Sequence, residues 1–469
     1  MTAAPSRRAT AVLYAALLLF AAVGVWHQGR RPGIDDAYIY FRYARNIADG
    51  SGWTYNPGRA GADAVTSPLY VLLLSIFARL GINLIRAGDA LFIGGMTLCA
   101  CATHALLARL RHWWAGAAAA VLVVASPTVG VTRGMETGLF LASIALALYL
   151  WISERDVGLG IGLAAVVLAR PDGIIFVPVV LAAKWVMDRR PPVKTMLSGA
   201  AVAVTWLLFG ALVADYLLPD TLAAKIAQGR SGFWLTDFFD GLRDLPKAYG
   251  RADGILMVIG LVGLVVVTLR AQSLRWPLGV LLGATVVQMA FYQALGLPPY
   301  RWYYVLPVYC ASVFAGVALE WTALALLERW RPLVVLPVAA LVAVVAVGFA
   351  NIPHGVQPPR DEYEAAAEWI NGHTPRHATV AATEIGILGY YTDRTVIDYL
   401  GLTDRSAIEP LGRGDLTWWV NHLAPDYWMT VGFPMEGPAR NAPWFGTVFH
   451  EVYRNGYVAI YQRVGRAPV

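Results

Sequence analysis

Residues 333–350 read LVVLPVAALVAVVAVGFA, an uncharged apolar run. A helix needs roughly 20 mainly apolar residues to cross the hydrocarbon core of a bilayer. Similar runs recur at about 10–26, 89–108, 115–132, 137–152, 157–169, 174–187, 195–214, 254–269, 276–296 and 302–323. The sequence therefore predicts a polytopic α-helical membrane protein with about eleven transmembrane helices.

The composition agrees with a membrane location. The chain is 57% hydrophobic and 14% charged, whereas soluble domains average about 25% charged residues. The chain has a net charge of +6. In a membrane protein, Lys and Arg mark the cytoplasmic loops, so this positive charge does not indicate a nucleic-acid partner. Cys99, Cys101 and Cys310 lie inside apolar runs, without the spacing of a disulfide framework or a zinc site.

Basic residues cluster in alternate loops between the apolar runs. These residues are Arg109, Arg111, Arg155, Lys184, Arg189, Arg190, Lys194, Arg270, Arg275, Arg329 and Arg331. Cytoplasmic loops carry the excess of Lys and Arg. Counting run 68–81 as a span would invert this pattern, so we interpret it as an interfacial or re-entrant helix. We expect a multi-pass protein of the cytoplasmic membrane, with its N-terminus cytoplasmic and its C-terminal domain extracytoplasmic.

Two domains are expected. Residues 1–350 form the transmembrane domain, which carries two long outer segments at 27–88 and 215–253. Residues 351–469 have the pattern of a soluble α/β domain, with a helix near 361–371 and strands near 379–383 and 395–398. Asn455-Gly456 between two further apolar stretches indicates a β-hairpin.

The first outer segment begins with two adjacent carboxylates, Asp35 and Asp36. A carboxylate near a low-dielectric boundary holds its proton more tightly, which suits a general base. The alternative is that both residues cap a surface helix. Tyr38, Arg42 and Arg45 follow at helical spacing, so we expect an amphipathic helix that lies along the membrane interface.

Further ionisable and aromatic residues fall at the outer ends of the expected spans. They are Glu136, Arg170, Asp172, Lys225, Arg301, Trp302 and Tyr303. Ionisable groups at membrane depth are costly and are therefore functional-site candidates, although each alone is also compatible with a helix cap or a structural ion pair. Arg170, Lys225 and Arg301 are candidate ligands of a phosphate group. The aromatic residues either contact sugar or lipid or form an interfacial belt.

Several motifs, in this order, resemble those of the C-type glycosyltransferases (GT-C superfamily). The motifs are DDAYIYFRYARN (35–46), GSGWTYNPG (50–58), TSPLY (66–70), GMETGLF (134–140), RPDG (170–173) and PDTLAAK (219–225), with a looser continuation at 389–404. These polytopic enzymes use polyprenyl-phosphate sugars at the outer face of the membrane. The first outer segment is most similar to the mycobacterial terminal β-(1→2) arabinofuranosyltransferase family, whose donor is decaprenyl-phosphoryl-arabinofuranose and whose acceptor is a cell-wall arabinan.

The resemblance implies that Asp35 and Asp36 are catalytic, without indicating which is the base. The residues expected to bind substrate are Tyr38, Arg42, Tyr43, Glu136, Asp172, Trp302 and Tyr303. We expect transfer of a sugar, arabinofuranose by this resemblance, to a hydroxyl of a glycan, lipid or protein acceptor. A divalent metal is compatible with adjacent carboxylates, but the ligand set is incomplete.

Three alternatives remain open. A related GT-C enzyme would transfer mannose or another sugar to protein or lipid. A transporter or flippase of lipid-linked sugars would place its ionisable groups near the bilayer midplane. A non-enzymatic cell-wall scaffold or receptor would function through residues 351–469. In a glycosyltransferase, we expect these residues to recognise the acceptor.

Overall fold

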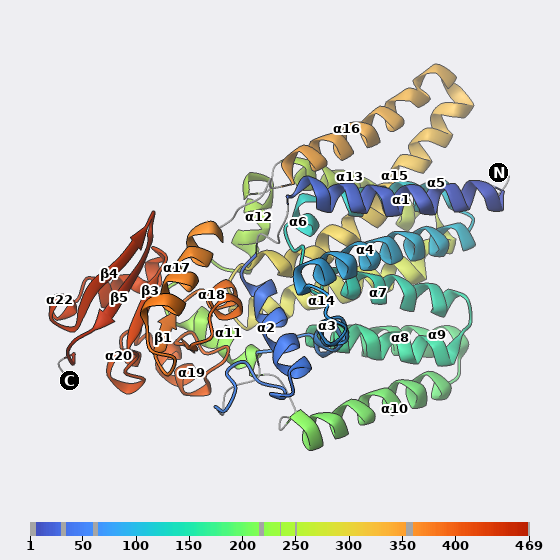
Figure 1. Cartoon of the computed structure of the whole chain (residues 1–469). Helices are drawn as coiled ribbons and strands as arrows, with labels where there is room; N and C mark the ends of the chain where they lie inside the picture. The colour runs from blue at the N-terminus through green and yellow to red at the C-terminus, as the bar shows by residue number, and fades with distance from the viewer. Residues whose placement is uncertain are drawn as a thin grey trace.

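The computed structural model describes residues 6–29, 34–59, 64–214, 220–234, 236–248, 251–352 and 360–467. Long helices form a bundle, and the C-terminal domain lies at one end of it (Figure 1). Residues 215–219, at the start of the second predicted outer segment, lie outside the described residues.

Each predicted apolar run coincides with one helix of the bundle. These helices are α1 (Arg7–His27), α4 (Leu84–Arg109), α5 (Trp113–Ala125), α7 (Thr137–Ile152), α8 (Asp156–Ala169), α9 (Phe176–Asp188), α10 (Val193–Phe209), α13 (Arg251–Leu269), α14 (Arg275–Ala294), α15 (Val305–Arg329) and α16 (Val335–Asn351). Among the described residues, 7 helices are long and apolar enough to cross a membrane by length and composition. The polytopic helical fold class is therefore confirmed, and the count of eleven spans stays a prediction.

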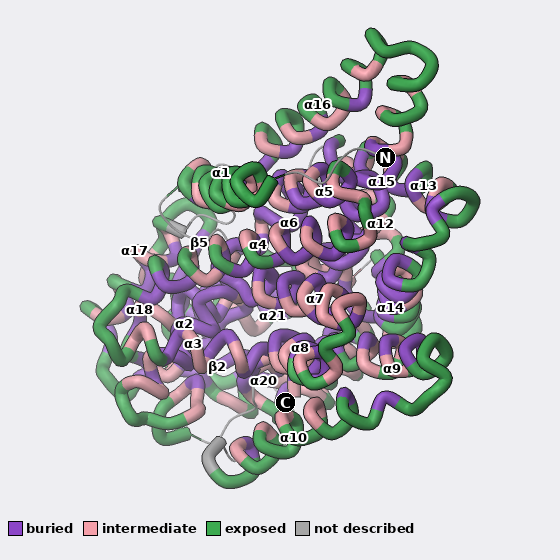
Figure 2. Tube along the Cα trace, turned by 90° about the vertical axis from the view of Figure 1, so that its right-hand side faces the viewer, coloured by how far each residue is buried: buried purple, intermediate pink, exposed green. Residues whose placement is uncertain are grey.

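Small residues allow the central helices to approach closely. A Cβ added to Gly95 of α4 would lie 2.5 Å from the Gly138 carbonyl carbon of α7, and one added to Gly316 of α15 would lie 2.4 Å from the Ala115 oxygen of α5. Packing of this kind drives helix association in lipid. The helices α10 and α16 are instead largely exposed along their apolar lengths (Figure 2). Exposed apolar surface is what a bilayer covers.

The segments between the long helices form shorter helices at the domain end of the bundle. The first outer segment folds into α2 (Asp36–Ala48) and α3 (Pro68–Arg79), and the second into α11 (Thr221–Arg230) and α12 (Phe238–Ala248). One turn, α6 (Pro127–Gly130), precedes α7. Two 3-10 turns, η1 (Pro171–Ile175) and η4 (Arg301–Tyr304), precede α9 and α15. These short elements position the candidate site.

The C-terminal domain is a five-stranded mixed sheet with the order β2-β1-β3-β5-β4. The strands are β1 (Thr379–Ala382), β2 (Thr395–Asp398), β3 (Tyr427–Thr430), β4 (Phe449–Asn455) and β5 (Val458–Arg463). The strand β1 is parallel to β2 and β3, whereas β5 is antiparallel to β3 and β4. The turn between β4 and β5 contains Gly456 at φ +58°, as the Asn-Gly signal predicts. Helices of the domain are α17 (Arg360–His373), α18 (Gly386–Tyr391), α19 (Ile408–Gly412), α20 (Trp419–His422), α21 (Gly437–Arg440) and α22 (Phe445–Val448).

The helix α2 forms where the sequence predicts it, and the protein itself covers most of its surface. Of its 13 residues, 9 are buried, and it packs between α3 and α18. Its arginines contact the C-terminal domain, because Arg42 donates to the backbone oxygens of Gly389 and Arg394, and Arg45 donates to that of Tyr390. The C-terminal domain therefore buries the polar face of α2.

Candidate active site

A cavity of about 230 Å³ lies where the bundle, α11 and the C-terminal domain meet. Its polar wall contains Asp36, Tyr40, Glu136, Arg170, Asp172 and Lys225. Aromatic and apolar side chains complete the lining, among them Ile39, Met135, Ile174, Ile175, Leu222, Phe291, Tyr292, Leu297, Trp302, Tyr303 and Leu402. A cavity lined by both polar and apolar side chains suits an amphiphilic ligand.

The two adjacent aspartates have different surroundings. Both carboxylate oxygens of Asp35 accept backbone N–H bonds, from Gly386 at 2.6 Å and from Ile387 at 2.7 Å. Asp35 therefore caps the N-terminus of α18 in the C-terminal domain, not its own helix. Asp36 is half-buried and lines the cavity. Of the pair, Asp36 is the carboxylate available for chemistry.

Burial raises the pKa of Asp36, and the ammonium of Lys225 opposes this shift. Burial also raises the pKa of Asp35 to about 6, although the N–H groups of Ile387 and Gly386 favour its ionised form. A carboxylate that binds its proton more tightly than a free aspartate is a better general base near neutral pH. The raised pKa suits both carboxylates to this role, and the position of Asp36 on the cavity wall favours it as the base.

Lys225 is a buried cation on the cavity wall. Its Nζ lies 3.9 Å from the centroid of the Tyr300 ring and 5.6 Å from that of Trp302. Within the described ranges, no carboxylate comes within the 4.0 Å of an ion pair with this ammonium. Asp36, Asp398 and Glu384 surround it more loosely, and burial lowers its pKa. Lys225 is therefore a cation that can take an anionic ligand.

The position of Lys225 is fixed by the helix that carries it. On α11, Gln228 donates to the backbone oxygen of Leu400 at 2.9 Å and accepts from the Tyr300 hydroxyl at 2.7 Å. Arg405 forms an ion pair of 2.8 Å with Asp220 at the start of the same helix. The helix α11 is thus held between the bundle and the C-terminal domain.

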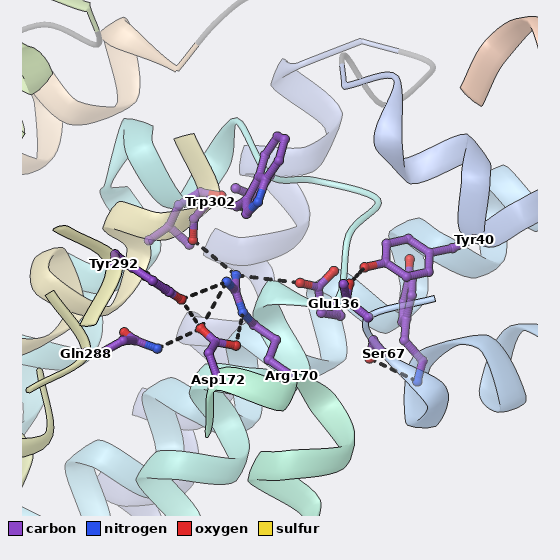
Figure 3. Close-up of polar contacts among 12 residues, drawn as sticks. Tyr40, Ser67, Glu136, Arg170, Asp172, Gln288, Tyr292 and Trp302 are labelled. Carbon is purple, nitrogen blue, oxygen red and sulfur yellow. Dashed lines mark hydrogen bonds and ion pairs between the residues drawn. The ribbon is translucent and has the colours of Figure 1, made fainter. Parts of the chain in front are cut away.

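Arg170 is surrounded by partners (Figure 3). Its guanidinium contacts both oxygens of Asp172, at 3.1 and 3.2 Å, and donates to the backbone oxygen of Trp302 at 3.1 Å. It also lies 3.6 Å from a carboxylate oxygen of Glu136. These contacts occupy the N–H donors of Arg170 and give it a structural role in the lining of the cavity. Arg170 is therefore less suited than Lys225 to bind a phosphate.

Glu136 is buried and lines the cavity beside Arg170. Among the described residues, its Oε2 has no hydrogen-bond partner. A buried oxygen without a partner carries a desolvation cost that a bound hydroxyl would relieve. The neighbouring Tyr40 hydroxyl is hydrogen-bonded to Thr66 on the same wall. This part of the cavity suits a ligand rich in hydroxyl groups.

Several predicted site residues lie elsewhere. Tyr38 packs against Phe41 and Tyr390, and the Tyr43 hydroxyl accepts the backbone N–H of Ala64 at 3.2 Å. Arg42 contacts backbone oxygens of the C-terminal domain, as described above. None of the three lines the cavity, because the packing of α2 against its neighbours holds their side chains elsewhere. Arg301 is half-buried at the start of η4 and is also absent from the lining. Glu136, Asp172, Trp302 and Tyr303 line it, as does Asp36.

Sequence reasoning missed the acidic residues that the C-terminal domain contributes. Asp398, at the end of β2, accepts N–H bonds from Leu400, Leu402 and Thr403, and its pKa is raised to about 6 by burial. Asp398 falls in the loosely matching motif at 389–404, and this motif was the one feature of the sequence that could have indicated it as a site residue. Glu384 follows β1 and carried no signal, since a single acidic residue in a soluble domain is usually solvated. In the part of the chain that the structure describes, no group of three or more His, Cys, Asp or Glu residues is arranged to hold a metal ion.

Solved structures share this architecture over nearly the whole chain. ArnT from Cupriavidus metallidurans bound to undecaprenyl phosphate superposes with a TM-score of 0.54 at 12% identity, covering 99% of this chain and 100% of ArnT. The Archaeoglobus fulgidus oligosaccharyltransferase tethered with an acceptor peptide gives a TM-score of 0.59 at 13% identity, covering 96% and 74%. Arabinofuranosyltransferase AftD from Mycobacteria gives 0.55 at 15% identity, covering 99% of this chain but only 40% of AftD.

These similarities show that the chain has the GT-C fold. A family model described as "Domain of unknown function (DUF8728)" matches residues 351–466, and no curated protein matches the sequence.

Proposed function

We propose that this protein is a membrane glycosyltransferase that moves a sugar from a polyprenyl-phosphate donor to an acceptor hydroxyl. The observation that carries the proposal is that Asp36 and Lys225, a base and a cation, line one cavity with an apolar side. The GT-C fold supports it, and the related ArnT structure contains undecaprenyl phosphate.

The apolar side of the cavity suits the lipid part of the donor. Ile174, Leu222 and Phe291 line the cavity and are also exposed apolar side chains. In a membrane protein, such residues meet acyl chains, so a polyprenyl chain can leave the cavity between η1, α11 and α14. The single phosphate of the donor would then lie against Lys225.

The reaction is a single displacement. The acceptor hydroxyl gives its proton to Asp36 as its oxygen bonds to the anomeric carbon. The bond between that carbon and the phosphate oxygen breaks, and the lipid phosphate leaves with the electron pair. Lys225 stabilises the charge that develops on it, so the leaving group needs no proton. The configuration at the anomeric carbon is inverted.

The sugar we propose is arabinofuranose, and the acceptor is a glycan of the cell envelope. The motifs of the first outer segment support this choice, as does the fold shared with AftD. Within the same reaction type, transfer of mannose or another sugar to protein or lipid is the second candidate. The basic loops support an outward-facing site on the cytoplasmic membrane. The ionisable groups gather at the domain end of the bundle, which argues against a transporter with a midplane site.

Two matched variants test the proposal. Asp36→Asn should lower kcat by about 10²- to 10⁴-fold without changing stability, because it removes the base but no structural hydrogen bond. Asp35→Asn should lower thermal stability as well, since its amide would face two N–H donors, at a cost of about 1–3 kcal/mol. The assay offers purified protein several polyprenyl-phosphate sugars in parallel and identifies products by mass spectrometry. Wild-type rates in Asp36→Asn would refute the assignment of the base.

A further inference from the structure

Gln228 lies next to the candidate phosphate cation on the same helix. It follows Lys225 by three positions in α11, and residues at this spacing share one face of a helix. Its side chain is buried, with 1% of the residue exposed. Among the described residues, Lys225 lines the cavity and Gln228 does not, so any effect of Gln228 on the reaction is transmitted by its neighbours.

The two ends of the Gln228 amide are bonded to different domains. Its Nε2 donates to the backbone oxygen of Leu400 at 2.9 Å, just after β2 of the C-terminal domain. Its Oε1 accepts from the hydroxyl of Tyr300 at 2.7 Å, just before η4 of the bundle. An amide has both a donor and an acceptor end, whereas a carboxylate has only acceptors and an alkyl group has neither. Position 228 therefore needs an amide to hold both partners.

Tyr300 connects this amide to the ammonium of Lys225. The Nζ atom lies 3.9 Å from the centroid of the Tyr300 ring, within the range of a cation–π interaction. The same ring is stacked on Trp302, with centroids 4.7 Å apart and planes at 8°, and Trp302 lines the cavity. The hydrogen bond from Tyr300 to Gln228 thus fixes the orientation of the ring that supports the ammonium.

The helix α11 contacts both domains directly beside Gln228. On the side of the bundle, a Cβ added to Gly229 would lie 1.9 Å from the backbone oxygen of Gly296. On the side of the C-terminal domain, Ala227 packs in one apolar cluster with Leu411 of α19. Unpaired polar groups are costly in such a dry interface. In a variant without the amide, the two surfaces should therefore separate to admit water, and α11 should shift with them.

We infer that Gln228 is a positioning residue of the transfer reaction, which holds Lys225 where the departing phosphate needs a cation. It does so by joining Tyr300 of the bundle to Leu400 of the C-terminal domain. This inference rests on the proposed function. It gives the C-terminal domain a part in the phosphate site, in addition to any part that it has in acceptor recognition.

Gln228→Leu tests this role because leucine has a similar size and removes both hydrogen bonds. We expect kcat to fall by on the order of 10- to 100-fold, since small misplacements of a catalytic group have effects of this size. In a Lys225→Met background, the same substitution should lower kcat by less than about twofold, because the cation that Gln228 positions is absent. A general loss of structure would lower kcat equally in both backgrounds, and that result would overturn the inference.

Tyr300→Phe removes one of the two hydrogen bonds without changing α11. The ring beneath Lys225 remains, so we expect a smaller loss of kcat, about 3- to 10-fold, which also disappears in the Lys225→Met background. Wild-type kcat in Tyr300→Phe would contradict the inference even where Gln228→Leu fails to fold.

Gln293→Leu is the matched control. Gln293 of α14 also donates one side-chain hydrogen bond, to Asp237, and accepts one, from the N–H of Phe239. Gln293 is absent from the lining of the cavity, so kcat should stay within about twofold of the wild type. A loss as large as that in Gln228→Leu would overturn the special role of Gln228.

Binding of undecaprenyl phosphate to the purified protein in detergent gives a readout that needs no sugar. Lys225→Met and Gln228→Leu should each weaken the affinity by about 10-fold, and the double variant should bind no more weakly than Lys225→Met alone. An affinity that does not change in Gln228→Leu would overturn the inference. Wild-type protein that binds this lipid in a Gln228-dependent manner but transfers sugar from no donor would instead refute the proposed function.

Discussion

Replacing Gly386 with alanine is a direct test of how tightly the C-terminal domain is coupled to the candidate base. Gly386 begins α18, and its N–H is bonded to the side chain of Asp35. A Cβ at this position would lie 1.9 Å from the backbone oxygen of Asp35 and 2.8 Å from its Oδ2. The closer atom is backbone, so no side-chain rotation relieves the clash.

The size of the displacement follows from these distances. Carbon and oxygen atoms ordinarily meet at about 3.3 Å, so α18 and the start of α2 must separate by roughly 1.4 Å in Gly386→Ala. Asp36 is the next residue along the chain and moves with Asp35. A misplacement of about 1 Å in a catalytic group costs on the order of 10²-fold in rate, which is the loss of kcat that we expect.

The matched control is Gly372→Ala in the same domain. Gly372 lies in α17, and a Cβ there meets nothing within 4 Å. Both variants would be assayed for transfer from polyprenyl-phosphate sugars, with thermal unfolding in detergent measured alongside. Wild-type activity in Gly386→Ala, or an equal loss in Gly372→Ala, would refute the argument that this contact positions Asp36.

Three further outcomes are expected. Lys225→Met should lower kcat by about 10²-fold, since the leaving phosphate loses its cation, and Lys225→Arg should recover part of the rate. Initial rates at saturating donor measure both effects. Equal rates in the two variants would contradict the role of Lys225. Arg170→Gln should destabilise the fold by about 3–5 kcal/mol because it leaves the buried Glu136 and the half-buried Asp172 without their cation. The exposed Arg405→Gln should cost less than about 1 kcal/mol, and unfolding midpoints distinguish the two variants. The pKa of Asp36 is raised by burial, and a base is ionised above its pKa and protonated below it. On acidification, kcat/KM should therefore fall with a midpoint above 3.8, the ordinary pKa of an aspartate. A pH–rate profile measures this midpoint, and a value at or below 3.8 would exclude Asp36 as the base.

The bundle could be predicted from the sequence because its signal is local. Each apolar run is long enough to be recognised without knowledge of its neighbours, and each coincides with a helix. The hairpin at Asn455-Gly456 and the first two strands have equally local patterns. Helix termini were less accurate, since capping contacts decide them.

The candidate site could be predicted only in part, because its geometry depends on contacts between distant segments. Asp36 and Lys225 could be proposed as partners, but nothing local distinguishes Asp36 from Asp35. The difference arises from the N–H groups of Gly386 and Ile387, which lie 351 and 352 positions away. The contacts of the polar face of α2 likewise could not be predicted, since the domain that covers this face is encoded at the other end of the chain.

Arg42 joins the earliest and latest parts of the chain by donating to the backbone oxygens of Tyr55, Gly389 and Arg394. Its partner at Gly389 is 347 positions away. During biosynthesis, the helical bundle is therefore inserted in the membrane well before the segment that locks α2 has left the ribosome. A chain truncated before Gly389 would therefore have the helices of the bundle but not the contacts that hold α2 in place.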